Sequence, residues 1–418
     1  MQRISYTFLL ILTSLITQAS SILVPMDESQ KNHLKAYGLA YWTISNNVDI
    51  QWLLNYRGGS FLIKNLQPVE SELNIRGITY EIIADARVNL ILQEIADPQV
   101  NMEIVKLEKA PKIAVYTPKT KQPWDDAVTL VLAYAEIPYE KIYDEEIIAG
   151  KLPTYDWLHL HHEDFTGQYG KFYAAYRNAA WYQEEQRAAE ARATKLGFPK
   201  VSQLKLGVAK KIQEFTAGGG FLFTMCSGTD SYDIALSAEG IDICESMFDG
   251  DASDPNANSK LKYTNTFAFQ NFKLHPNPME YEYSDIDATT YRKVSKENDV
   301  FSLFEFSAKW DIVPTMLNQN HEQIIKGFMG QTTAFRKEFI KPGVLILGEN
   351  KAIGEAKYIH GEFGKGTWTF YAGHDPEDYQ HAVGDPPTDL NLHPNSAGYR
   401  LILNNILFPA AKKKPQKT

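Results

Sequence analysis

The sequence predicts an α/β protein whose main part is a doubly wound parallel sheet, with a small α+β domain before it and an insertion within it. From residue 112 onward, short apolar runs rich in β-branched residues alternate with helical segments, which is typical of parallel sheets covered by helices. One such run follows three consecutive glycines and ends at Cys226, as expected for a buried strand that turns into a helix. Residues 22–110 lack this alternation and mix strand-like and helix-like patterns.

Apolar spacing and turn residues place the individual elements. For the α+β domain, 22–110, we expect a strand at 22–26, a helix at 32–41 despite its Gly38, a hairpin with arms at 52–56 and 61–63, and a helix at 88–95. For the α/β domain, 111–411, we expect strands at 113–117, 141–143, 155–161, 218–225 and 367–371, and helices at 124–135, 184–195, 203–215, 229–238 and 397–407. We interpret the less regular stretch 245–355 as an insertion.

The composition excludes several classes of protein. With 418 residues, of which 44% are hydrophobic and 22% charged, the chain is neither mainly disordered nor collagen-like. Its 42 Lys and Arg residues against 51 Asp and Glu residues give a net charge of −9, so nucleic acid is not an expected partner. The one basic run lies in residues 412–418, which we expect to be an exposed C-terminal tail.

Residues 1–21 have the layout of a secretory signal peptide. Arg3 gives a short positive region, residues 4–16 are apolar, and small residues that suit cleavage follow. The apolar stretch is shorter than the roughly 20 residues that span a bilayer, although a signal anchor or a buried helix is the alternative. We therefore expect an exported, periplasmic or extracellular protein with no stable membrane insertion after cleavage. In such a compartment Cys226 and Cys244 could form a disulfide, and their number alone does not decide this.

Cys226 is the candidate nucleophile. It ends a predicted strand and is followed by Ser227, Gly228 and a helix, so the thiolate would face a crevice and gain stabilisation from the helix N-terminus. The N–H groups of Ser227 and Gly228 could form an oxyanion hole. The alternative is a buried cysteine that serves only as a small apolar side chain.

His374 is the candidate general base. It follows the strand expected at 367–371, whose carboxyl end lies at the same edge of a parallel sheet as Cys226. Asp375 and Glu377 come directly after it, and a carboxylate that orients the imidazole completes an activated Cys–His pair. The alternative is an ordinary polar loop at the edge of the sheet.

A further polar cluster ends the strand expected at 155–161. His159 and His161 would point to one face of that strand, where both could bind a divalent metal, with His374 as a further ligand. His162 and Glu163 follow at the edge. The alternative is a set of hydrogen-bonded histidines beside Cys226, and we expect no other cofactor.

Residues 112–240 together with 367–377 resemble the class I glutamine-amidotransferase-like superfamily. They are most similar to its biotin-protein-ligase N-terminal-type and trehalose-utilisation-type domains. The resemblance implies a flavodoxin-like sheet, a nucleophile at Cys226 after a Gly-rich strand, and a catalytic histidine at His374.

The sequence differs from the family pattern at two places. The family has one residue between the catalytic His and Glu, whereas Asp375 and Pro376 stand here, so the orienting acid is Glu377 or Asp375. The family also has a Gly-rich oxyanion turn where this chain has His161, His162 and Glu163. These three residues are therefore expected beside the nucleophile.

Over its full length, including Asn55–Ser60, the chain also resembles exported proteins labelled asparagine synthetase B. Enzymes of that name use a cysteine directly after the initiator Met, where this chain has Gln2. They also use a Ser-Gly-Gly-x-Asp-Ser pyrophosphate loop, and the run from Ser227 to Ser231 is one residue shorter. Glutamine-dependent asparagine synthesis is therefore kept as an alternative.

The leading functional hypothesis is a cysteine hydrolase or amidotransferase-like enzyme acting on an amide or ester of a small molecule or cell-envelope component. A second hypothesis is a non-catalytic module that binds glycans or envelope components, for which Trp181 and Tyr182 could offer stacking surfaces. A third is a metal-dependent hydrolase built on His159, His161 and His374.

Overall fold

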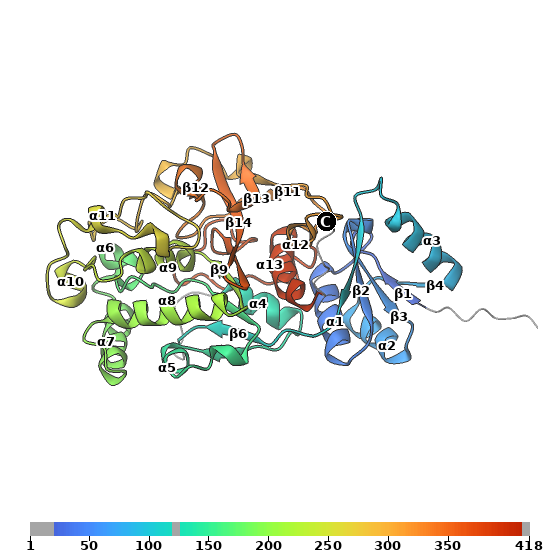
Figure 1. Cartoon of the computed structure of the whole chain (residues 1–418), viewed down its shortest axis with the longest axis horizontal. Coiled ribbons are helices and arrows are strands. Elements are labelled where there is room, and N and C mark those ends of the chain that lie inside the picture. Colours follow the sequence, from blue (N-terminus) through green and yellow to red (C-terminus); the bar gives the residue numbers. More distant parts are fainter. Residues whose placement is uncertain (1–20, 119–125, 412–418) are drawn as a thin grey trace, which may run out of the picture.

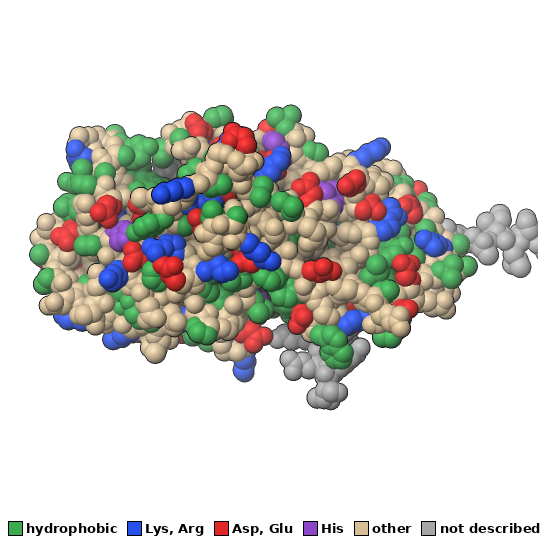
Figure 2. Space-filling view, turned by 90° about the horizontal axis from the view of Figure 1, so that it is seen from above, with side chains coloured by type: hydrophobic (Ala, Val, Ile, Leu, Met, Phe, Trp, Pro, Cys, Tyr) green, Lys and Arg blue, Asp and Glu red, His purple; other side chains and the backbone are tan. Residues whose placement is uncertain are grey.

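The computed structural model describes residues 21–118 and 126–411, and Figure 1 shows an elongated molecule with the N-terminal sheet at one end, the second sheet in the middle and helices at the other end. The expected signal peptide (1–20) and basic tail (412–418) lie outside the described residues, whereas Ser21, which we had placed in the leader, begins the first strand. Within the described ranges, no helix is both long and apolar enough to cross a membrane. On the face shown in Figure 2, basic and acidic side chains are interspersed.

The N-terminal sheet is antiparallel, with the strand order β4-β1-β3-β2-β5. Its strands are β1 (Ser21–Val24), β2 (Ile50–Leu54), β3 (Ser60–Lys64), β4 (Glu81–Ile83) and β5 (Glu103–Leu107). Alternate residues face opposite sides. Ile22 and Val24 pack with helices α1 (His33–Ser45) and α2 (Gln67–Arg76), whereas Leu23 packs with α3 (Asp85–Ala96).

The second sheet is mixed, with the strand order β11-β10-β13-β14-β15-β9-β8-β6-β7 and β12 paired to β14. Its strands are β6 (Ile113–Tyr116), β7 (Glu140–Ile142), β8 (Trp157–Leu160), β9 (Phe221–Met225), β10 (Val300–Leu303), β11 (Ile324–Lys326), β12 (Phe335–Arg336), β13 (Leu345–Asn350), β14 (Glu355–Phe363) and β15 (Gly366–Tyr371). Five neighbouring strands, β15, β9, β8, β6 and β7, are parallel to one another. All the other strand pairs of this sheet are antiparallel.

The prediction of a wholly parallel sheet is therefore wrong for its second half. The stretch 245–355, expected to be a separate insertion, contributes β10 to β13 to the same sheet, and β14 was not predicted. Short turns containing Gly354 and Gly364 join β13 to β14 and β14 to β15, and turns this short can join only antiparallel neighbours. Alternation of strands and helices in the sequence does not predict such hairpins.

Helices cover both faces of the parallel strands. Ala114, Leu158 and Leu222 face the core formed with α8 and α9, whereas Val115 and Phe223 face the core formed with α4 and α13. The helices of this region are α4 (Ala127–Tyr134), α5 (Asp144–Ile148), α6 (Tyr173–Tyr176), α7 (Ala180–Lys195), α8 (Val201–Ala217), α9 (Ser227–Ser237), α10 (Ser246–Asp249), α11 (Ala257–Lys260), α12 (Ile312–Leu317) and α13 (Ala397–Leu407).

Helix α1 joins the two sheets, because it packs against α4 and α13 as well as against its own sheet (Figure 1). Gly38 allows this close approach: a Cβ atom on it would lie 1.8 Å from the carbonyl oxygen of Ala135. The fully buried Arg400 of α13 donates to the Tyr37 hydroxyl at 3.1 Å and to the Met26 carbonyl at 2.9 Å. The glycine that weakened the prediction of a helix is thus a packing requirement of that helix.

We expect Gly38→Ala to lower the free energy of unfolding by about 1–3 kcal/mol, because the added methyl group meets rigid backbone. Gly207→Ala in α8 is the matched control, since its methyl group meets side chains rather than backbone, namely the Phe198 ring at 3.1 Å and Ile148 Cδ1 at 3.7 Å, and alanine favours helices. Urea denaturation of both variants tests this. A Gly38→Ala protein as stable as Gly207→Ala would contradict the tight α1–α4 contact.

Candidate active site at the carboxyl ends of the parallel strands

The carboxyl ends of β8, β9 and β15 meet at a pocket with a volume of about 300 Å³. Cys226 follows β9, His374 follows β15 and His162 follows β8, and all three line this pocket. Aromatic side chains that include Phe172 and Tyr281 complete its wall. The sheet therefore gathers the predicted nucleophile and base at one edge.

Cys226 has a strained backbone. Its dihedral angles are φ 50° and ψ −140°, a conformation that costs energy for any residue with a side chain. Its N–H donates to the Gly373 carbonyl at 3.2 Å, and its own carbonyl accepts from the Thr229 N–H at 3.1 Å. The sharp turn between β9 and α9 is thus fixed to the end of β15, which carries His374.

The resting sulfur of Cys226 is a protonated thiol. Burial raises the pKa of Cys226 to about 12, and the carboxylates of Asp230 and Asp287 act in the same direction. The backbone N–H groups of Ser227 and Gln331 hydrogen-bond to the sulfur and oppose this effect. Attack on a substrate therefore requires a base, and two N–H donors already stand at the sulfur.

The His374 ring belongs to a cluster of imidazoles. Its centroid lies 4.6 Å from that of His161, 6.3 Å from that of His162 and 4.9 Å from that of His381. Burial, followed by the neighbouring imidazoles, holds the pKa of both His374 and His162 well below the usual range. His374 is consequently neutral at neutral pH and keeps a nitrogen lone pair.

Asp126 supplies the carboxylate of this cluster, and the sequence analysis did not identify it as a site residue. It caps α4 by accepting from the Thr129 N–H at 2.9 Å, and it lies 3.3 Å from His159 Nε2 and 3.3 Å from His161 Nδ1. Burial raises the pKa of Asp126, but the two imidazoles outweigh burial and hold it well below its usual value. Its position at the start of a helix after a parallel strand is the signal that could have found it.

The structure does not bring the predicted orienting acids to the His374 ring. Glu377 lies 3.1 Å from His393 Nδ1, and Asp375 accepts from the Glu377 N–H at 2.9 Å. Within the described residues, neither carboxylate has a hydrogen bond or ion pair with the His374 ring. Nearness in sequence does not bring Asp375 or Glu377 to the His374 ring, because the chain turns away from the cluster directly after His374.

The Gly228 N–H, expected in the oxyanion hole, and Glu163, expected beside the nucleophile, have other partners. The N–H of Gly228 donates to the His161 carbonyl at 2.6 Å, so it is not available to a substrate. Glu163 accepts from the Tyr143 hydroxyl at 3.1 Å and lines a separate cavity of about 60 Å³. Burial raises the pKa of Glu163 to about 8. The N–H of Ser227 and that of Gln331, which lies in the expected insertion, are the donors that remain.

The two cysteines are not bonded to each other. Both are free and buried, and Cys244 donates from its sulfur to the Thr166 carbonyl at 3.3 Å. Cys244 does not line the pocket that contains Cys226. It therefore serves as a matched control for experiments on Cys226.

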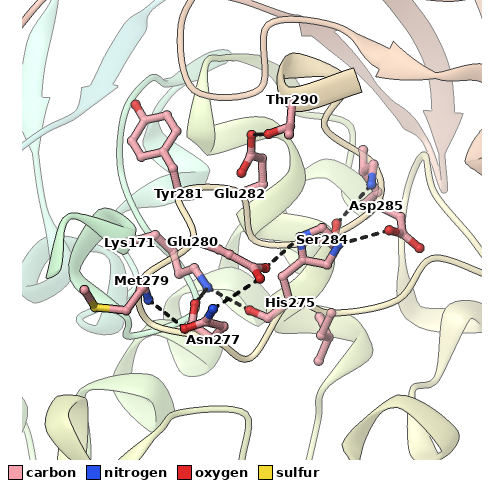
Figure 3. Close-up of polar contacts among 12 residues, drawn as sticks. Lys171, His275, Asn277, Met279, Glu280, Tyr281, Glu282, Ser284, Asp285 and Thr290 are labelled. Carbon is pink, nitrogen blue, oxygen red and sulfur yellow. Dashed lines mark hydrogen bonds and ion pairs between the residues drawn. The ribbon is translucent and has the colours of Figure 1, made fainter. Parts of the chain in front are cut away.

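A loop beside the pocket is fixed by Lys171, as Figure 3 shows. Lys171 Nζ donates to the carbonyls of His275 at 2.7 Å and Asn277 at 3.0 Å, while Met279 and Tyr281 of the same loop line the pocket. Burial lowers the pKa of Lys171 to about 8. Its amine holds this wall in place, and Lys171 itself also lines the pocket.

A second buried lysine supports the loop that carries Gln331. Lys357 on β14 donates from Nζ to the carbonyls of Phe328 and Thr333, and its amine lies 4.0 Å from the centroid of the Phe328 ring. Burial, followed by the positive charge of Arg292, lowers the pKa of Lys357 to about 7.

No protein-family model matches the chain, and no curated protein matches it. Among solved structures, the chain is similar to Cytoplasmic Protein STM3548 from Salmonella typhimurium, with 10% identity over 72% of this chain and 100% of that chain and a TM-score of 0.35. It is also similar to Cytoplasmic Protein STM1381 from Salmonella typhimurium LT2, with 14% identity, the same coverages and a TM-score of 0.37. A catalytic mutant of Gan42B, a GH42 beta-galactosidase from G. stearothermophilus, matches at 11% identity over 63% of this chain and 27% of its own, with a TM-score of 0.27. Likenesses this weak carry no argument about function.

We expect Cys226→Gly to be more stable than Cys226→Ala by about 1 kcal/mol, because glycine adopts this backbone conformation without steric cost. Both substitutions remove the sulfur, so each serves as the control for the other. Urea denaturation measures the difference. An alanine variant that is equally stable or more stable would contradict strain at this turn.

The pKa of Lys357 predicts a pH dependence of stability. Between pH 7 and 10.5 the unfolded chain binds more protons at this lysine than the folded chain, so its contribution to the free energy of unfolding rises with pH. We expect the stability of the wild type relative to Lys357→Met to increase from pH 7 to 9, by about 1.4 kcal/mol per pH unit at most. Urea denaturation at several pH values tests this, and a constant difference would contradict the lowered pKa.

Proposed function

We propose that this protein is a cysteine-dependent hydrolase that acts on an amide or ester of a small molecule. The observation that carries the proposal is the strained turn at Cys226, with φ 50° and ψ −140°, which directs the residue into the pocket that His374 also lines. Strained turns of this kind between a strand and a helix hold nucleophiles in hydrolases, and such strain is retained mainly at functional sites.

In the proposed mechanism, the Cys226 thiol transfers its proton to the neutral His374 as the sulfur attacks the substrate carbonyl carbon. The N–H groups of Ser227 and Gln331 stabilise the negative charge that develops on the carbonyl oxygen. His374 then returns the proton to the departing amine or alcohol, which leaves a thioester on Cys226. A water molecule, deprotonated by the same imidazole, attacks the thioester carbonyl. As the C–S bond breaks and the acid is released, the imidazolium returns the proton to the Cys226 sulfur.

His161 and Asp126 act as positioning residues in this mechanism. The Asp126 carboxylate holds the His161 ring through Nδ1, and that ring lies 4.6 Å, centroid to centroid, from His374. The imidazole that acts as base is therefore oriented by ring packing, while the acids that follow it in sequence are engaged elsewhere.

The pocket volume of about 300 Å³ suits a small substrate rather than a polymer, and its aromatic wall suits an apolar group beside the scissile bond. We also propose that the α/β region has the flavodoxin-like fold of the class I glutamine-amidotransferase-like superfamily. The order β7-β6-β8-β9-β15 supports this, because numbered along the chain it reads 2-1-3-4-5. Export of the protein is proposed from the pattern of its first 21 residues alone.

The other functions have less support. Tyr182, expected as a stacking surface for sugars, is only 2% exposed, and Trp181 packs against Tyr176 with a centroid distance of 5.2 Å. The run from Ser227 to Ser231, compared above with a pyrophosphate loop, is entirely buried in α9. Neither glycan binding nor asparagine synthesis therefore has a specific observation in its favour.

We expect the mature protein to hydrolyse p-nitrophenyl acetate or γ-glutamyl-p-nitroanilide, and Cys226→Ala to abolish the activity. His374→Gln is expected to lower kcat/KM by about 10²–10⁴-fold, because it removes the base but retains a hydrogen-bonding side chain. Cys244→Ala is the control and should retain the wild-type rate. Initial rates with both probes, with thermal denaturation to confirm folding, measure these effects.

A folded Cys226→Ala protein that still hydrolyses either probe at the wild-type rate would refute the thiol mechanism. A loss of activity in Cys244→Ala equal to that in Cys226→Ala would show that the effect of the latter is not specific to the pocket.

A further inference from the structure

Three histidines at the inner end of the pocket are placed as a metal site would require. One ring nitrogen of each of His161, His162 and His374 lies within 4.8 Å of those of the other two. His161 and His162 follow β8 and His374 follows β15, so the three rings come from two strands that flank β9. Backbone hydrogen bonds within one sheet therefore hold all three.

We propose that His161, His162 and His374 bind one Zn²⁺ ion, and that the bound ion holds the hydrolase inactive. Imidazole nitrogens favour zinc and similar transition metals over Mg²⁺ and Ca²⁺. Three protein ligands with a fourth position open to a pocket form a common zinc arrangement. His162 and His374 line the cavity that contains Cys226, so an ion bound to them would lie beside this cavity.

The contact of His161 with Asp126 is the second observation. Histidines that bind metals usually donate their other ring N–H to a carboxylate, which fixes the tautomer and directs the free lone pair at the ion. His161 Nδ1 lies 3.3 Å from Asp126 Oδ1, an ion-pair distance, and neither Nδ1 nor Nε2 has a hydrogen-bond partner among the described residues. His161 is 1% exposed, so its Nε2 has little access to water. A metal ion bound to Nε2 would satisfy the lone pair of this nitrogen.

His381 and His159 support this assignment without belonging to the triad. The His381 ring stacks on His374 with a centroid distance of 4.9 Å and is itself held by Asp378, 2.9 Å from its Nδ1. His159 directs Nε2 at Asp126 rather than at the triad, although the sequence analysis expected it among the ligands. Asp126, His159 and His161 form a second grouping of possible ligands, so His161 is shared between the expected pair and the proposed triad.

The inhibitory part of this inference rests on the proposed function. In the proposed mechanism His374 uses its lone pair to accept the proton from Cys226, and a coordinated His374 has no lone pair to offer. Zinc occupancy and thiol attack therefore exclude each other at one residue.

The binding test uses the full mature protein after removal of metals with a chelator. Isothermal titration with Zn²⁺ and metal analysis after dialysis should give one ion per chain. We expect His161→Gln and His162→Gln to weaken binding by at least 10-fold. Asp126→Asn, which keeps an oxygen that can cap α4, should weaken it by about 10–100-fold. His393→Gln, a change at a half-exposed histidine outside the cluster, is the matched control and should bind as the wild type does.

Co²⁺ provides a second readout that does not depend on activity. We expect intense visible absorption bands, typical of a four-coordinate site, in the wild type and in His393→Gln but not in His162→Gln. Failure of the wild type to bind stoichiometric Zn²⁺ or Co²⁺ would overturn the inference. Equal weakening in His393→Gln and the triad variants would overturn it as well.

Hydrolysis of p-nitrophenyl acetate, measured with and without Zn²⁺, separates the two proposals. One equivalent of Zn²⁺ should abolish wild-type activity and a chelator should restore it, while His162→Gln should lose this zinc sensitivity relative to its own zinc-free rate. Zinc binding in a protein without thiol-dependent activity would support the metal site and refute the proposed function. Hydrolysis that appears only when zinc is added would overturn the inhibitory role.

Discussion

The close contact between Gly228 and the end of β8 determines the geometry of the whole site. The Gly228 N–H donates to the His161 carbonyl at 2.6 Å, and a Cβ atom on Gly228 would lie only 2.5 Å from that oxygen. This contact brings the first turn of α9 against β8, while the N–H of Cys226 joins β9 to β15 through Gly373. Backbone hydrogen bonds consequently hold the turn at Cys226 against the ends of β8 and β15, which carry the imidazoles.

Burial then determines the protonation states of Cys226 and His374. It raises the pKa of Cys226 to about 12 and lowers that of His374, so both groups rest in their neutral forms. Within the pair of Cys226 and His374, charge would appear only when a substrate or a cation arrives, and burial would leave that charge weakly screened. The proposed proton transfer to His374 and the proposed coordination of an ion by His374 would use the same uncharged, preorganised nitrogen.

The sequence allowed the prediction of those features that depend on local pattern. The parallel strands β6 to β9, the position of Cys226 between β9 and α9, and the position of His374 after β15 all follow from runs of apolar residues and their turns. Features set by distant contacts were not predictable in this way. Asp126 reaches His161 across two strand ends, and Gln331 reaches Cys226 from a stretch interpreted as an insertion. Similarly, Glu377 was expected at His374 because it is near in sequence, but the turn of the chain takes it to His393.

The shared core of the two sheets has a consequence for synthesis of the chain. Helix α1 is made early, yet the surface that covers it belongs largely to α13, and the residues after α13 return to β5, where the Glu108 N–H donates to the Ala410 carbonyl at 2.7 Å. The chain therefore cannot complete its fold progressively from the N-terminus. Until α13 is made, α1 presents an uncovered apolar surface, which favours aggregation of the nascent chain up to that moment.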